Sequence, residues 1–452
     1  MSENAKLTRG SITGHLVGQT LPMIIGVGAM MSIGLVDSYF IGQLGGAQLA
    51  AISFIYPVTG ALASLGVGVM VGVNSVVARA LGQGDQERAE RRANFGIAFA
   101  TVVGLVLAGA LLLANDTLFR LMQVTPDLMP YIRAYMIPFA LGFPLSLMLM
   151  GFNGVLRGQG EARRTSVISI TYASANWVLD PLLIAGHFGF PQLGVAGAAW
   201  ASVAGWALAC VMSVWLLKST SLPFQPSQIM QCDMRATLAP IVRVAGPAAL
   251  SNAINPVGLS VLTALMASQG QAAVAAFGAG GRVQSFAVVP LLGLSGAIGA
   301  IVGQNWGAGL HDRSRRAMQE AGWFCVFYGL GMALLLSFAG EWFGGLFSND
   351  PQLVRSIATY LGISAWGYAG YGLLITANGA LNAIGKASAS LVQSVARVFL
   401  VMVPLAFVLR PLWGEEGIFY AELAANILGG VIAVLVTARL LRKQTDHAAS
   451  GI

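Results

Sequence analysis

Long apolar segments recur along the whole chain, separated by short polar joints, and this alternation limits the possible folds more than any other feature. A helix needs about 20 apolar residues to cross a bilayer, whereas a membrane barrel shows strands of about ten alternating residues. The sequence therefore predicts an all-α polytopic membrane protein with twelve transmembrane helices. The expected spans are residues 14–40, 48–78, 94–115, 130–152, 164–186, 193–217, 237–266, 273–302, 320–342, 354–377, 388–409 and 416–438.

Charged residues make up only 10% of the chain, against about 25% in soluble domains. The net charge of +7 suggests no nucleic-acid partner, because the basic residues lie in short patches between spans. One set of joints holds 20 of the 25 Lys and Arg, counting Arg397, and Arg282 lies inside a span. Because positive loops face the cytoplasm, both termini are expected there, in a plasma or bacterial inner membrane.

The two halves of the chain repeat each other at an offset of 225 residues. Matching pairs include Pro22 and Pro247, Gly84 and Gly309, Tyr135 and Tyr360, Asn153 and Asn378, and Gly160 and Gly385. Six spans per half give both halves the same orientation. We therefore expect two pseudo-symmetric six-helix lobes, 1–218 and 237–452, joined by a cytoplasmic linker at 219–236. Substrate sites in duplicated transporters lie at the interface of the repeats.

Two carboxylates, Asp37 and Asp180, lie within apolar spans of the first half. A charge at the centre of a bilayer costs about 2.5–3.5 kcal/mol on insertion scales. At the same offset they fall on Leu262 and Leu405, so the scaffold itself does not require them. Both lie about 25–35 Å from the cytoplasmic end of their spans at 1.5 Å per residue. They can therefore share one cavity.

The chemistry expected of these acids is ion coupling. Burial favours the protonated form of a carboxyl group, and a second acid nearby favours it further. When ionised the pair attracts a cation, and when protonated it releases it, which is antiport by linkage. Asn176 lies one helical turn before Asp180 on the same face, where its amide can donate to a carboxylate or its oxygen can bind Na+. The structural alternative is that the acids pair with Arg or a backbone amide.

Several further residues are candidates for substrate contact or movement. Pro22 removes a helix hydrogen bond and marks a hinge in the first span, although its repeat mate favours a kink common to the fold. Tyr135 and Asn153 are cavity candidates, and their mates allow a shared structural role instead. Arg282 must be paired or reach water. Glu422, near the start of the last span, can simply favour a helix N-terminus.

Enzymatic and metal-binding motifs are missing from the sequence. Cys210, Cys232 and Cys325 are an odd number at wide spacing and form no metal or disulfide pattern. There is no nucleotide-binding G-x-x-x-x-G-K-[ST] loop, so any pumping must use an ion gradient. We expect no enzyme, no catalytic residue, no cofactor other than H+ or Na+, and a monomer whose partners are the lipid bilayer and small drugs.

Four stretches carry a resemblance to a known family. They are Val36 to Gly42, Ala80 to Gly84, Asn153 to Gly160 and Gly194 to Ala199. In this order, in a duplicated chain, they resemble the MATE (multidrug and toxic compound extrusion) family over nearly the full length. The DinF-like branch is the most similar, since its members carry acids in the first and fifth spans and a proline in the first.

The resemblance implies proton antiport by alternating access, with export of amphipathic and cationic compounds and resistance to antibiotics. It implies a coupling role for Asp37 and Asp180 and bending at Pro22. Ser202 stands near the start of the sixth span, where family members often have Thr. These roles come from the resemblance.

Alternative functions remain open at this point. The NorM-like branch carries acids on the seventh and tenth spans, and none lies here between Arg243 and Met266 or between Arg355 and Lys386. Sodium coupling at Asp37, Asn176 and Asp180 is one alternative. A lipid-linked precursor flippase of the same superfamily is another, although it would need a more cationic cavity, for which only Arg282 is available.

Overall fold

The computed structural model describes residues 5–231 and 234–449, and within these ranges helices are the only regular secondary structure. The first half contains one long helix per expected span. These are α1 (Ile12–Leu44), α2 (Gly46–Gly82), α3 (Gln86–Leu121), α4 (Met129–Gly158), α5 (Ala162–Leu183) and α6 (Val195–Leu217). Cys232 lies outside the described residues, and Cys210 and Cys325 are buried free thiols.

The second half follows the same order but with interrupted helices. They are α7 (Met234–Ala267), α8 (Gln271–Ala287), α9 (Val289–Gly307), α10 (His311–Gly345), α11 (Pro351–Ser364), α12 (Tyr368–Ala383), α13 (Ala387–Val395) and α14 (Val403–Ala449). A bend of 43° separates α8 from α9. Among the described residues, eight helices are long and apolar enough to cross a membrane, or nine if this bent pair is one span.

Three more irregularities occur in the second half. A 3-10 turn, η5 (Ala365–Gly367), joins α11 to α12, and a π-helical segment, η6 (Ala396–Met402), joins α13 to α14. Inside α14 the backbone of Gly414 leaves the helical region, with φ 59° and ψ −132°. Mid-helix 3-10 and π turns often mark hinges or functional sites.

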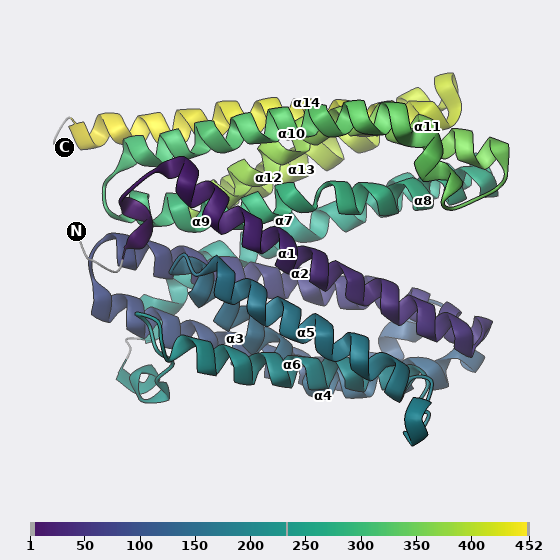
Figure 1. Ribbon diagram of the computed structural model, residues 1–452, viewed down its shortest axis with the longest axis horizontal. Helices are drawn as coiled ribbons and strands as arrows, with labels where there is room; N and C mark the ends of the chain where they lie inside the picture. Colours follow the sequence, from purple (N-terminus) through teal and green to yellow (C-terminus); the bar gives the residue numbers. More distant parts are fainter. Residues whose placement is uncertain (1–4, 232–233, 450–452) are drawn as a thin grey trace. The chain divides into compact units, whose positions relative to one another are not determined.

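The chain forms two compact units. One includes Ile25–Ala249, and the other includes Leu7–Ile24 and the residues from Leu250 onward. In the first unit α4 packs against α2, α3, α5 and α6, and in the second α12 packs against α9, α10, α13 and α14 (Figure 1). The central helix of each unit is therefore surrounded by helices in equivalent positions of the sequence.

Glycines with a left-handed backbone occur at matching turns of the two halves. Only glycine adopts this region without strain, so these positions require glycine in both halves. Gly84 and Gly309 have φ of 79° and 74°, and Gly160 and Gly385 have φ of 75° and 80°. Each pair is separated by the offset found in the sequence. The repeat is therefore present in the backbone conformation as well as in the residue types.

The offset changes to 220 residues for the last span of each half. Gly194 (φ 57°, ψ −131°) has the backbone conformation of Gly414. Three residues later, Gly197 packs against the carbonyl group of Leu183, as Gly417 packs against that of Leu409. The loop before α6 is longer than its counterpart in the second half, which explains the shift. In this register Ser202 corresponds to Glu422, whereas the uniform offset would have paired Glu422 with Gly197.

The first helix runs without interruption through Pro22. Close packing surrounds this part of α1: a Cβ on Gly293 of α9 would lie 2.9 Å from the Ile24 side chain and 3.4 Å from the Thr20 carbonyl oxygen. The missing side chain at Gly293 therefore lets α9 approach α1 beside the proline. The hinge at Pro22 stays a prediction.

Candidate functional site

Two helices of the first unit bring Asp37 and Asp180 together. α1 and α5 approach closely at Gly26, where a Cβ would lie 3.2 Å from the Cα of Ser166. Further along, Trp177 Nε1 donates a hydrogen bond of 3.1 Å to Ser32 Oγ and holds the two helices in register. Beyond this contact, the carboxyl groups of Asp37 and Asp180 lie within hydrogen-bond reach of each other.

Apart from each other, the two acids have little to bind. Asp180 is fully buried, and neither of its oxygens, nor Oδ1 of Asp37, accepts a hydrogen bond from a donor group in the described part of the chain. No Lys or Arg of the described residues forms an ion pair with either acid. The structural alternative, an ion pair with arginine, is therefore not formed.

This arrangement has a direct chemical consequence. An ionised carboxylate can only accept hydrogen bonds, so two of them cannot bond to each other until one carries a proton. Two unpaired charges of the same sign at close range, one of them fully buried, are also strongly unfavourable. The pair at Asp37 and Asp180 therefore needs a shared proton or a bound cation.

Asn176 and Ser202 form the polar support beneath Asp180. Asn176 is fully buried, and its Nδ2 donates to the Tyr172 backbone oxygen at 2.9 Å. Ser202 Oγ donates to Asn176 Oδ1 at 3.2 Å. The amide thus bonds to its own helix one turn back, a common competitor for Asn side chains. The expected contact between the Asn176 amide and a carboxylate is not formed.

The packing of α5 against α6 depends on Gly205. A Cβ at this position would lie 2.7 Å from Asn176 Nδ2 and 2.8 Å from the Tyr172 ring. The missing side chain allows α6 to approach closely enough for Ser202 to reach Asn176. It also seats Trp206 on Tyr172, with ring centroids 6.2 Å apart and planes 22° apart.

An aromatic wall continues from this stack toward α4. Phe139 meets Trp206 edge-on at 5.5 Å and stacks on Tyr135 at 5.9 Å. Tyr135 and Tyr172 both interact electrostatically with Asp37 and Asp180, so the wall stands beside the acids. Aromatic faces attract cations. The site combines negative charge with a surface suited to flat, cationic groups.

Sequence reasoning missed several members of this site, among them Tyr172 and Phe139 of the aromatic wall. Tyr56 of α2 shares a hydrogen bond of 2.9 Å with Ser38, next to Asp37, and Trp206 joins the aromatic wall. Ser38 belongs to the stretch that carried the resemblance, which is the one available signal. Nothing in the sequence selected Trp206 from nine tryptophans.

The structure separates Asn153 from the other candidates. It lies 18 residues after Tyr135 in α4, about 27 Å along the helix. Its Nδ2 donates to the Leu149 backbone oxygen at 2.9 Å, and neighbouring Gly154 packs against the Met70 carbonyl oxygen. Asn153 therefore does not join the acids, and its surroundings are those of helix packing.

The second unit contains a different chamber around Glu422. This carboxylate is 4% exposed and lines a cavity of about 360 Å³, which Arg282 also lines. Glu422 accepts hydrogen bonds from Gln284 Nε2 at 2.8 Å and from Tyr360 Oη at 3.2 Å. It lies two turns beyond Gly414. The alternative of a helix N-terminus is wrong for this residue.

Arg397 lines the same cavity and corrects a second expectation. The charge count placed it with the cytoplasmic joints, but it is only 6% exposed within the π-helical segment η6. Its guanidinium donates to Asn426 Oδ1 at 2.6 Å and to Asn255 Oδ1, and lies 5.4 Å from the centre of the Tyr371 ring. Arg397 is an interior charge.

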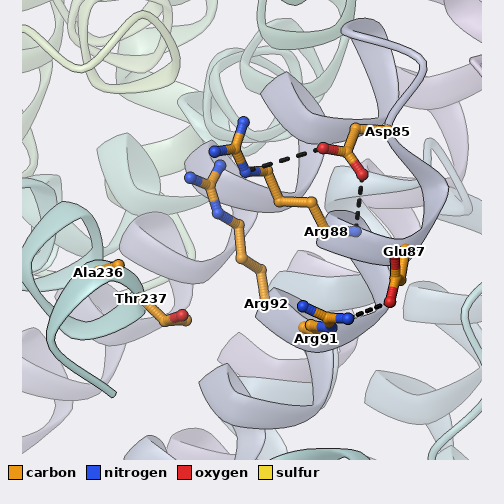
Figure 2. Close-up of a pocket in the computed structure, with 7 residues that line it drawn as sticks. All are labelled: Asp85, Glu87, Arg88, Arg91, Arg92, Ala236 and Thr237. Atoms are coloured by element: carbon orange, nitrogen blue, oxygen red, sulfur yellow. Dashed lines mark hydrogen bonds and ion pairs between the residues drawn. The ribbon is translucent and has the colours of Figure 1, made fainter. Parts of the chain in front are cut away.

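Another pocket, of about 340 Å³, lies at the beginning of α3 (Figure 2). Asp85 caps the helix by accepting from the Arg88 backbone nitrogen at 2.9 Å, and its other oxygen lies 3.9 Å from Arg88 Nε. Figure 2 also shows Glu87 paired with Arg91. An acidic cap and first turn stabilise a helix N-terminus. This pocket therefore has a local structural explanation.

Together, a duplicated bundle of long apolar helices and two carboxyl groups side by side within it define a class of helical membrane transporter. Residues 22–182 and 247–408 match the family model described as MatE, once in each half. The chain belongs to the MatE family. The predictions of family and fold class are confirmed, and the chain is a multi-pass membrane protein of a family of transporters rather than enzymes.

Three similar proteins illustrate the range of the family. The FAD transporter of Shewanella oneidensis is 32% identical over 97% of both chains. The probable multidrug resistance protein NorM of Deinococcus radiodurans is 29% identical over 95% of both. The solved structure of a mutant MATE transporter VcmN from Vibrio cholerae superimposes with a TM-score of 0.91 at 26% identity, covering 96% of this chain and 97% of that one.

Proposed function

We propose that this protein exports amphipathic, mostly cationic compounds by proton antiport with alternating access. The main support is the pair of carboxyl groups, Asp37 and Asp180, which lie within hydrogen-bond reach of each other, while neither oxygen of Asp180 nor Oδ1 of Asp37 has a donor among the described residues. The pair can hold a proton or a cation. The DinF-like branch assignment, the cytoplasmic termini, the monomer and a hinge at Pro22 belong to this proposal.

Antiport follows because a proton and a cationic compound compete for the same pair of carboxyl groups. With a proton bound, one carboxyl group donates to the other and the net negative charge falls. When the proton leaves, the repelling carboxylates favour a cationic compound seated against the wall of Tyr135 and Tyr172. Because each ligand lowers the affinity for the other, a proton gradient drives export. A pH difference supplies about 1.4 kcal/mol per unit for each proton.

Two relatives support a broad substrate range. Both NorM of Deinococcus radiodurans and the multidrug export protein MepA of Staphylococcus haemolyticus carry multidrug names, and the latter is 25% identical over 96% of this chain. Proton coupling is preferred to sodium coupling at Asp37, Asn176 and Asp180 because Asn176 Oδ1 already accepts a hydrogen bond from Ser202. A sodium ion would find only one lone pair of that oxygen still available.

Transport assays in reconstituted vesicles distinguish proton coupling from sodium coupling. We expect uphill export of a fluorescent monocation under a pH gradient with Na+ omitted, and no export under a sodium gradient at equal pH. One proton exchanged for one monocation moves no net charge, so a membrane potential alone should have no effect. Two protons per monocation would add about 2.3 kcal/mol per 100 mV. Export driven by Na+ alone would refute the proton scheme.

A second candidate is export of a flavin dinucleotide. The FAD transporter of Shewanella oneidensis is the relative that suggests it. The specific observation in this chain is the chamber lined by Arg282 and Arg397, since guanidinium groups pair well with phosphate. Efflux of FAD from loaded vesicles, compared with efflux of a monocation under the same gradient, tests this candidate.

A further inference from the structure

The chamber of the second unit has the walls of a ligand site. Its cavity of about 360 Å³ lies at the lower end of the range of small-molecule pockets. Phe277, Tyr360 and Tyr371 provide aromatic surface, and Asn255 and Asn426 provide amides. Apolar and aromatic walls with a few convergent polar groups are typical of sites for organic ligands.

The charges of the chamber favour an anion. Two guanidinium groups, Arg282 and Arg397, line it together with one carboxylate, Glu422, which leaves a net formal charge of +1. The oxygens of Glu422 already accept bonds from Gln284, Tyr360 and Ser364, the last at 3.5 Å. The carboxylate is therefore satisfied by neutral donors.

Arg397 retains a free donor. Its two terminal nitrogens bond to Asn426 and Asn255, but Nε is buried and has no hydrogen-bond partner in the described part of the chain. No ion pair within 4.0 Å joins Arg397 to Glu422 among the described residues. If Arg397 served only to neutralise Glu422, the two side chains would be expected in direct contact.

The backbone is shaped to hold this arginine. The π-helical segment η6 contains Arg397, and such turns are frequent at functional sites. A Cβ on Gly429 would lie 2.9 Å from Arg397 Cγ, and one on Gly258 would lie 2.6 Å from Met402 Cε. Glycines thus make room for the arginine stem and for the neighbouring wall.

From these observations we propose that the chamber binds the anionic group of an aromatic compound, a phosphate or carboxylate joined to a planar ring. Arg397 and Arg282, which both line the cavity, supply the two positive charges that the anionic group meets. The ring lies against the aromatic walls. The use of this site in export rests on the proposed function, but the binding itself does not.

Two flavins test the proposal with the same ring. Riboflavin is neutral and flavin mononucleotide carries a phosphate, so their difference in affinity isolates the anionic group. Quenching of flavin fluorescence by the full chain in detergent gives both dissociation constants. We expect flavin mononucleotide to bind at least about tenfold more tightly, since hydrogen bonds between charged groups are stronger than those between neutral ones. Equal affinities would overturn the proposal.

Neutralising the basic and the acidic residues of the chamber in separate variants distinguishes an effect on binding from an effect on folding. Arg397→Gln should remove most of the preference for the phosphate and leave riboflavin unchanged, and Arg282→Gln, at an exposed position, should weaken it several-fold. Glu422→Gln should instead strengthen the binding of flavin mononucleotide. A purely structural role for these residues predicts parallel losses for both flavins. Unchanged phosphate preference in Arg282→Gln and Arg397→Gln together would refute the site.

The same assay distinguishes failure of this site from failure of the export mechanism. Asp37→Asn should abolish proton-driven export of a monocation without changing the affinity ratio of the two flavins. Inorganic phosphate should compete with flavin mononucleotide and not with riboflavin. A loss of the flavin ratio in Asp37→Asn would show that the anion does not bind in the Glu422 chamber.

Discussion

The two units share helices and turn glycines but differ in the charges they bury. In the first, Asp37 and Asp180 lie within reach of each other, and in the described part of the chain neither Asp180 oxygen nor Asp37 Oδ1 has a donor. In the second, Glu422 and Arg397 are both buried and each is bonded to neutral groups. Because Glu422 occupies the place of Ser202, the difference arises at equivalent points of one scaffold. The two units have therefore kept one helical scaffold while their buried charged residues differ.

The helices around the two sites differ as well. In the first unit, α2, α4 and α5 are continuous. In the second, the corresponding spans are broken by the bend between α8 and α9, the 3-10 turn η5 and the π-helical segment η6. Regular helices suit a fixed pair of acids, whereas irregular backbone re-aims side chains into a chamber. The two units are therefore expected to respond to different substitutions.

The largest effect should come from the first unit. Asp180→Asn removes the fully buried partner of Asp37, so the pair can no longer exchange a shared proton for a cation. We expect uphill export of a monocation in vesicles to fall at least about 100-fold, a loss of roughly 2.7 kcal/mol in coupling.

A carboxylate elsewhere in the same unit provides the control for this variant. Asp116 is partly exposed and paired with Arg133, so Asp116→Asn should leave export unchanged at equal expression. Surface ion pairs contribute at most about 1 kcal/mol. Retained export in Asp180→Asn would mean that the two units do not differ in coupling.

An intermediate effect is expected in the second unit at Gly280. A Cβ there would overlap the ring of Tyr360, which donates to Glu422. Gly280→Ala should therefore destabilise the protein by about 1–3 kcal/mol, the usual cost of overpacking. The thermal unfolding midpoint in detergent measures this.

The adjacent residue gives a matched control. A Cβ on Gly281 would meet nothing within 4 Å, so Gly281→Ala should keep or slightly raise the midpoint, because Ala favours a helix over Gly. If both variants lowered the midpoint equally, the placement of Tyr360 would be wrong.

Much of the first unit was within reach of sequence reasoning. Hydrophobic length predicted the spans, and the repeat showed that Asp37 and Asp180 have apolar mates. Equal depth along two helices that start on the same side was enough to suggest a shared site. These signals are local or periodic, which is why they survive without a structure.

The chamber of the second unit could not be predicted from the sequence in the same way. The uniform offset paired Glu422 with Gly197, because a shorter loop before Gly414 cannot be read from residue types alone. Arg397 was assigned to a cytoplasmic joint, since no residue pattern in the sequence predicts the π-helical segment that the chain forms there. Partners such as Gln284 and Asn426 depend on tertiary packing between helices far apart in sequence.

The smallest effect should fall on Ser202, the counterpart of Glu422. Ser202→Ala leaves Asn176 Oδ1 buried without its donor, which costs about 1–3 kcal/mol. Export should fall only a few-fold, because the hydrogen bonds of Asn176 to Tyr172 and Ser202 do not reach a carboxylate. Ser213→Ala on the same helix is the control, since the fully buried Ser213 Oγ donates to the Ala209 carbonyl oxygen of its own helix at 2.7 Å. A loss of export in Ser202→Ala as large as in Asp180→Asn would place Ser202 in direct contact with the transported ion, and the two units would then both couple through this position.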